Sequence, residues 1–103
     1  METKIYIQSR QHGPELLTLI KSAVQSEVTR LELGMQLACN RLKPFEDRYR
    51  VSSQHFIEQM AAEDLSGGDD EYIQWSGEYQ LMCKLRQKLQ KLKDLEYAHT
   101  SLL

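Results

Sequence analysis

The segment from Tyr72 to Leu95 constrains the fold more than any other part of this chain. Its apolar residues recur at steps of three or four, the spacing that places side chains on one face of an α-helix. These residues are Tyr72, Trp75, Tyr79, Met82, Leu85, Leu89, Leu92 and Leu95. At about 1.5 Å per residue the helix is roughly 36 Å long, so only another long helix can cover its apolar face.

Residues 14–50 predict that second long helix. Their apolar positions follow a repeat close to 3.5 residues, which is typical of a helix supercoiled against a neighbour. Pro14 suits the first helical turn, whereas Pro44 predicts a kink or a break. The repeat consists of Leu17, Ile20, Val24, Val28, Leu31, Met35, Ala38, Leu42, Phe45 and Tyr49, and it is widened by Leu16, Leu19, Ala23, Leu33 and Leu37. A face this wide indicates more than one neighbour.

Shorter elements complete the predicted fold. Residues 1–12 form an N-terminal strand or arm, because the residues around Ile5 and Ile7 alternate with period two. Ser52 is the expected N-cap of a short helix over residues 53–62. A loop containing two glycines then leads to the last helix over residues 70–97.

The predicted fold class is all-α. The chain of 103 residues forms one domain, a long antiparallel hairpin resembling a coiled coil, with the short helix bridging one end. The surplus apolar width predicts dimerisation into a helical bundle. No apolar run suits a membrane span or a signal peptide, so we expect a cytoplasmic protein. The isolated Cys39 and Cys83 favour a reducing compartment, with an interhelical disulfide as the alternative.

The sequence contains no recognisable catalytic, cofactor or metal site, so we expect a protein that is not an enzyme. The three histidines, His12, His55 and His99, are too scattered for zinc ligation. The acidic residues between Glu63 and Glu71 lack the ligand register of a calcium loop. Ser76 precedes a glycine inside a predicted helix, without the turn that a serine nucleophile requires.

Aromatic residues are the candidates for partner binding, with two interpretations. At helical spacing they belong to the core, but rigid rings near a helix start also serve as anchors for another protein. The candidate partner-binding residues are Tyr72, Trp75, Tyr79, Phe56 and Tyr49.

Basic residues at the end of the first long helix support an alternative function, a dimeric nucleic-acid-binding or transcription-regulatory protein. The candidate nucleic-acid contacts are Arg41, Lys43, Arg48 and Arg50. In an antiparallel hairpin these residues and the lysines of the last helix lie at opposite ends, so only a dimer would assemble a basic face. The net charge of −2 provides no bulk attraction to nucleic acid.

Several elements, taken in order, resemble a known group. They are Phe45-Glu46-Asp47-Arg48-Tyr49, Val51-Ser52-Ser53, Phe56-Ile57, the run from Asp69 to Trp75, and Gly77-Glu78-Tyr79 before a leucine-rich helix. The combination is similar to small, uncharacterised helical proteins of cyanobacteria, other bacteria and archaea, some of which are regarded as antitoxin-like partners in toxin–antitoxin modules. The similarity covers about residues 40–95, and the first 35 residues resemble the cyanobacterial members alone.

The resemblance implies a protein–protein interaction module, an antitoxin-like subunit that neutralises a small toxin. The expected partners are a second copy of the chain and a cognate protein, with no membrane contact and no cofactor.

Overall fold

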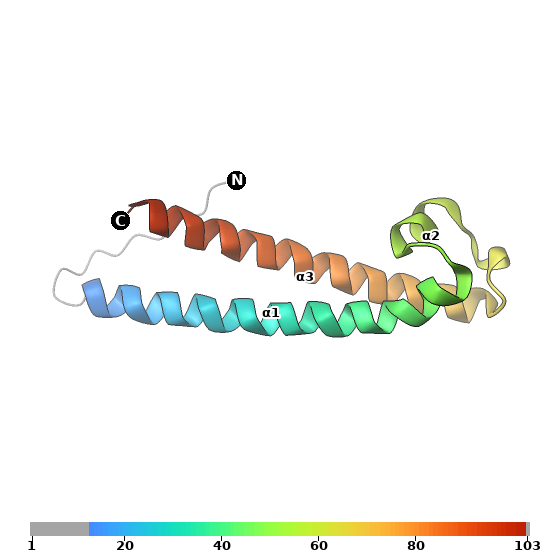
Figure 1. Cartoon of the computed structure of the whole chain (residues 1–103), viewed down its shortest axis with the longest axis horizontal. Helices are drawn as coiled ribbons and strands as arrows, with labels where there is room; N and C mark the ends of the chain where they lie inside the picture. Colours follow the sequence, from blue (N-terminus) through green and yellow to red (C-terminus); the bar gives the residue numbers. More distant parts are fainter. Residues whose placement is uncertain (1–12, 103) are drawn as a thin grey trace.

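The computed structural model describes residues 13–102 and contains two long helices that lie side by side (Figure 1). Helix α1 spans Gly13–Tyr49 and helix α3 spans Gly68–Leu102. Between them come the short helix α2, Ser53–Gln59, and a 3₁₀ helix, η1, Ala62–Asp64. The two long helices run antiparallel, which confirms the predicted all-α hairpin with a short bridging helix.

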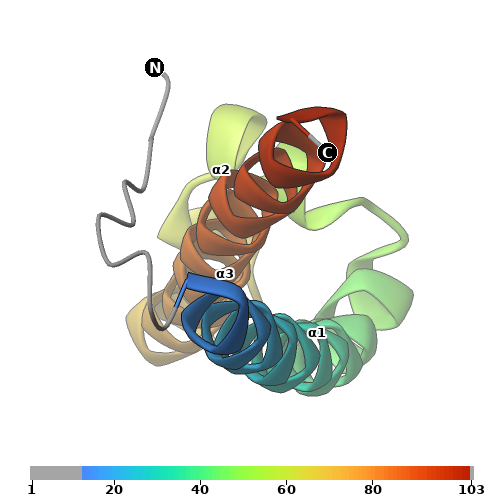
Figure 2. The ribbon, with the colours of Figure 1, turned by 90° about the vertical axis from the view of Figure 1, so that its left-hand side faces the viewer.

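The described part of the chain contains no strand. The predicted N-terminal strand falls in residues 1–12, outside the described residues. Figure 2, which looks along the hairpin, shows α1 and α3 diverging from strict alignment, with α2 at the far end. None of the described helices combines the length and the apolar composition that crossing a membrane requires.

Two apolar clusters hold the long helices together. At the end of the hairpin where α2 and η1 connect the long helices, here named the closed end, Leu42, Phe56, Leu65 and Trp75 are buried. Further along the hairpin, Val28 and Leu31 of α1 are buried against Leu89 of α3. Between the clusters Gly34 permits a close approach, because a Cβ there would lie 3.3 Å from Cδ1 of Leu85. The apolar stripes predicted at helical spacing therefore face each other.

Helix α1 continues through Pro44 to Tyr49, so of the predicted kink or break at this proline the break is absent. Figure 1 shows the axis of α1 curving towards α2 in its last turns. The helix ends because Arg50 adopts a left-handed backbone conformation, with φ of 56°. This conformation terminates a helix, although glycine adopts it at lower cost than arginine does.

Helix α2 begins as predicted and ends earlier than predicted. The Ser52 hydroxyl oxygen accepts a hydrogen bond from the His55 N–H at 3.1 Å, which confirms the N-cap. The helix ends at Gln59 rather than at residue 62, because Met60 is extended with ψ of 150°. The chain then forms η1, where the Ala61 N–H donates to Asp64 Oδ2 at 2.8 Å.

Helix α3 begins at Gly68, two residues before the predicted start, and ends at Leu102 rather than at residue 97. Gly68 has φ of 63°, a conformation that glycine tolerates without a steric penalty. Asp69 and Asp70 follow Gly68, so neither is the first residue of the helix. Both lie in its first turn, where their charge interacts favourably with the positive end of the helix dipole.

Candidate interaction surface

Trp75 forms the centre of the closed end and is fully buried. Its ring stacks on Phe56 with 3.9 Å between centroids and 1° between planes. Phe45 and Tyr49 of α1 also stack on it, at 5.4 and 5.6 Å. Since these rings come from α1, α2 and α3, this one residue fixes the mutual position of all three helices.

A chain of hydrogen bonds satisfies the polar edge of Trp75. The Trp75 Nε1–H donates to Ser53 Oγ at 2.8 Å, and Ser53 Oγ in turn donates to Glu46 Oε2 at 2.8 Å. The backbone N–H of Ser53 donates to the same carboxylate oxygen at 3.0 Å. Ser53 is buried, so water cannot replace these partners.

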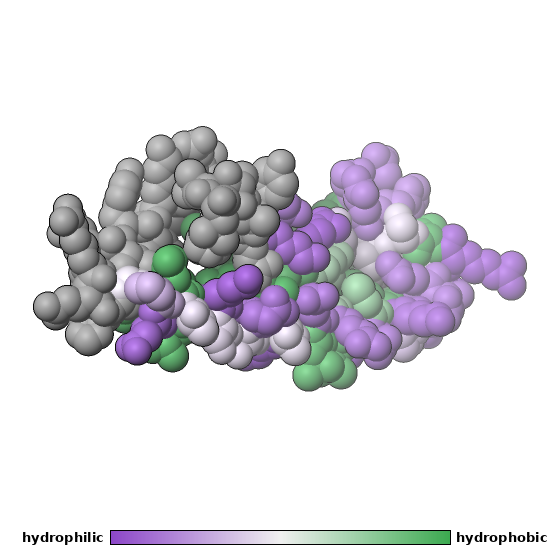
Figure 3. Space-filling model, turned by 60° about the vertical axis from the view of Figure 1, so that its left-hand side comes forward, coloured by the Kyte–Doolittle hydropathy of each residue, from purple (hydrophilic) through white to green (hydrophobic). Residues whose placement is uncertain are grey.

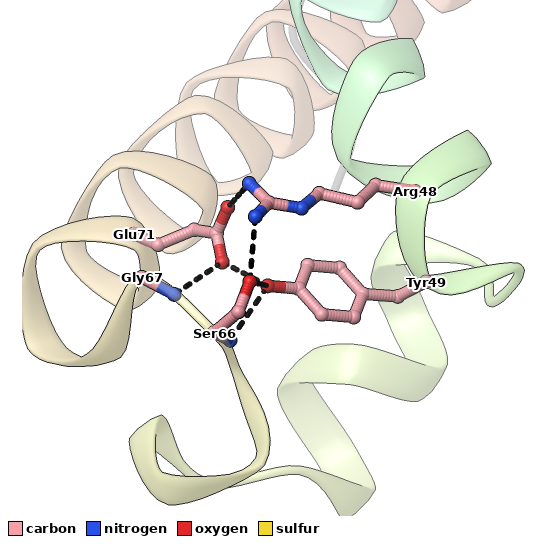
Figure 4. Close-up of polar contacts among 5 residues, drawn as sticks. All are labelled: Arg48, Tyr49, Ser66, Gly67 and Glu71. Atoms are coloured by element: carbon pink, nitrogen blue, oxygen red, sulfur yellow. Dashed lines mark hydrogen bonds and ion pairs between the residues drawn. The ribbon is translucent and has the colours of Figure 1, made fainter.

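A second polar network, the Glu71 network, joins the end of α1 to the start of α3 (Figure 4). Arg48 donates to Glu71 Oε2 at 2.7 Å and to Ser66 Oγ at 2.6 Å. The Tyr49 hydroxyl donates to Glu71 Oε1 and accepts from the Ser66 N–H at 2.9 Å. The Gly67 N–H donates to Glu71 Oε1 at 3.2 Å. The network closes the loop between η1 and α3.

These contacts stabilise the charged form of Glu71, which is only 8% exposed. The hydrogen bond from Tyr49 lowers the pKa of this carboxyl group most, and the Gly67 N–H and the positive charge of Arg48 lower it further. Burial raises the pKa, and the contacts outweigh it. Both carboxylate oxygens of Glu71 therefore accept hydrogen bonds within the fold, and the residue has a structural role.

The structure brings the predicted partner-binding aromatics together as a core. Phe56 and Trp75 are each 0% exposed, so neither offers surface to another protein in this fold. Tyr49, Tyr72 and Tyr79 are partly buried against the same cluster. Burial raises the pKa of Tyr79 above its ordinary value. A role in partner binding stays a prediction for the three tyrosines, whose edges reach the surface.

Two of the four predicted nucleic-acid contacts form ion pairs within the hairpin. Arg41 Nε lies 2.8 Å from Glu78 Oε2 of α3, and Arg48 belongs to the Glu71 network. Lys43 and Arg50 are exposed. Because two guanidinium groups already face carboxylates, this end of the hairpin carries less free positive charge than its sequence implies. Nucleic-acid binding stays a prediction.

Apolar side chains remain exposed along one flank of α1, here named the leucine stripe: Leu16, Leu19, Ala23, Leu33 and Leu37. Leu19 is 65% exposed, Leu33 57% and Leu37 47%. From sequence these residues only widened the apolar face, and they were not predicted as binding residues. The signal was present in their spacing, which is three or four residues from Leu16 through Leu19 to Ala23 and again from Leu33 to Leu37.

The two flanks of α1 differ in charge. At about 100° per residue the leucine stripe lies roughly 150° around the helix from the buried Val28 and Leu31, on the side of α1 that faces away from α3. Lys21 and Glu32 lie on the other flank and are exposed. Arg30 lies between Ala23 and Leu33 of the stripe, and its Nε donates to Glu27 Oε2 at 2.9 Å. A flank facing only water would normally carry charges as the other one does.

Leu81 of helix α3 is also exposed, at 41%. The Arg41–Glu78 ion pair fixes the register of the two helices here. Leu37 lies one turn before Arg41 and Leu81 nearly one turn after Glu78. Because the helices are antiparallel, both steps run in the same direction, so Leu37 and Leu81 lie at a similar level along the hairpin. Figure 3 shows apolar residues protruding along the lower edge of the molecule, where α1 lies.

Among the described residues no group of three or more histidine, cysteine, aspartate or glutamate side chains could hold a metal ion. Cys39 is an exposed free thiol, and Cys83 is a partly exposed one. The arrangement as a whole offers an apolar surface on a rigid hairpin.

Comparisons of the chain with protein-family models, with curated proteins and with solved structures found no match. The resemblance to antitoxin-like proteins therefore stays a prediction.

Proposed function

We propose that this chain is a non-enzymatic protein–protein interaction subunit whose leucine stripe contacts another polypeptide. The observation that carries the proposal is the clustering of half-exposed leucines on one flank of α1 that has no uncompensated charge. Single exposed leucines are common on soluble proteins, but a row of them on one face marks an interaction site.

Covering the leucine stripe contributes favourably to the free energy of binding a partner. Complete burial of a leucine side chain contributes about 1.5–3 kcal/mol. Leu19, Leu33 and Leu37 are each about half exposed, so a partner that covers them gains roughly 3 kcal/mol from these residues together. A micromolar complex needs about 8 kcal/mol net, so the apolar surface that the partner itself buries against the stripe must supply the remainder.

The closed end of the hairpin suits a scaffold role. The buried Trp75 cluster and the Glu71 network hold α1 and α3 together before any partner arrives, which lowers the entropy cost of binding. Following the resemblance of residues 40–95, we propose that the subunit assembled through the leucine stripe neutralises a small toxin protein. The product of the neighbouring gene is the first candidate.

Co-expression with that gene product tests the proposed function. The neighbouring gene alone should arrest growth, and this chain should relieve the arrest and co-purify with its product. Joint replacement of Leu19, Leu33 and Leu37 by serine should abolish co-purification. Ile73→Ser is the matched control, since Ile73 is 66% exposed but lies on α3 away from the stripe. A harmless neighbour, or undiminished binding by the triple variant, would contradict the proposal.

A further inference from the structure

We infer that a second copy of this chain covers the leucine stripe, with the two α1 helices packed antiparallel about a two-fold axis. The inference rests on the proposed function and names the polypeptide that the stripe contacts. Its basis is that the side chains of one stripe fit against those of an identical stripe that runs in the opposite direction.

Together with Ser26 and Arg30, which lie between its two halves, the stripe follows a heptad pattern with steps of three and four: Leu16, Leu19, Ala23, Ser26, Arg30, Leu33 and Leu37. Reversing one helix sets Leu37 of each copy opposite Leu19 of the other. The next layer inwards sets Leu33 opposite Ala23, so a large side chain meets a small one. The large-with-small pairing is the alternation that close packing requires.

The central layer sets Arg30 of each copy opposite Ser26 of the other. The small serine leaves room for the methylene groups of Arg30, while its guanidinium stays paired with Glu27 on its own helix. A parallel arrangement would instead set Arg30 against Arg30 and Ala23 against Ala23. The first pairing is repulsive and the second leaves a gap, so the sequence selects the antiparallel arrangement.

The outer layers of the interface pair two leucines. Leu37 is 47% exposed, and Leu19 of the other copy covers it. Leu19 is the most exposed leucine of α1, and this contact occurs once at each end of the interface. The two-fold operation repeats each contact, which doubles the area that one stripe supplies.

Site-directed crosslinking tests the register. In a background with Cys39→Ser and Cys83→Ser, one preparation carries Leu19→Cys and a second, distinguishable by an affinity tag, carries Leu37→Cys. A bismaleimide that spans about 10 Å, the usual distance between packed helix axes, links the mixed chains. The product joining positions 19 and 37 should exceed the 19–19 product at least tenfold, because in the antiparallel register two copies of position 19 lie about 27 Å apart along the axis.

A dominant 19–19 product would overturn the antiparallel arrangement, and a dimer that yields no 19–37 product would overturn the register. A monomeric wild-type chain that still co-purifies with the neighbouring gene product through the stripe would overturn the inference and leave the proposed function standing. A monomer that binds nothing would overturn both. Leu33→Ser should weaken the dimer at least tenfold, whereas Ile73→Ser should leave its dissociation constant unchanged.

Discussion

Replacing Ser53 by alanine should destabilise the closed end through Trp75 rather than through lost packing. The change removes the acceptor of the Trp75 Nε1–H, whose hydrogen bond measures 2.8 Å, and leaves this donor buried. An unsatisfied buried donor costs about 1–3 kcal/mol. We expect a loss near 2 kcal/mol, measured by urea denaturation followed by circular dichroism at fixed protein concentration. For a domain of this size the melting temperature should fall by roughly 10 °C.

A double-mutant cycle isolates that hydrogen bond. In a Trp75→Phe background no indole N–H exists, so Ser53→Ala should then cost less than about 1 kcal/mol. The remainder reflects Glu46, which loses the hydroxyl donor and keeps the Ser53 backbone N–H. If Ser53→Ala costs the same in both backgrounds, the buried hydrogen bond does not carry the effect and the reasoning fails.

Three further predictions concern other parts of the hairpin. Because Glu71 has a lowered pKa in the fold, its contribution is complete above about pH 4.3 and is lost as the pH falls through the folded pKa, so Glu71→Gln should flatten the acid limb of a plot of stability against pH. Gly77→Ala should raise the free energy of unfolding by about 0.5–1 kcal/mol in thermal melts, since the glycine is exposed inside α3 and a Cβ there meets nothing within 4 Å. Leu37→Glu and Leu19→Lys should each weaken the homodimer, and sedimentation of an equimolar mixture should show a restored heterodimer; failure of the mixture to associate would contradict the antiparallel pairing.

The long helices were predictable because one repeat extends over many residues. The apolar residues from Tyr72 to Leu95 and those within residues 14–50 recur at helical spacing. Burying these two apolar faces against each other is enough to predict the hairpin. Ser52 was also predictable as an N-cap, because a serine before a short apolar run has a specific hydrogen-bonding role.

The first and last residues of the helices were less predictable, because tertiary contacts determine them. Helix α1 passes Pro44 without a break, since packing over many turns outweighs one lost backbone hydrogen bond. Helix α3 starts early at Gly68 because the Glu71 side chain accepts the Gly67 N–H. That contact depends on Arg48 and Tyr49 from the end of α1, residues that no local pattern links to the start of α3.

The candidate site illustrates the same limit. Aromatic spacing correctly grouped the residues around Trp75, but spacing alone left open whether their rings were covered. The leucine stripe was visible as surplus apolar width, and only the packed hairpin showed which leucines remain exposed. Charge compensation of Arg41 by Glu78 required knowledge of the antiparallel register, which places residues far apart in sequence side by side.

Light scattering coupled to size-exclusion chromatography tests the central claim most directly, that another copy of the chain covers the leucine stripe. The wild-type protein should elute with twice the 12.0 kDa mass of one chain, and the variant with serine at positions 19, 33 and 37 should elute with the mass of one chain while circular dichroism shows its helices intact. A wild-type protein that keeps the mass of a single chain at concentrations well above micromolar would contradict the account.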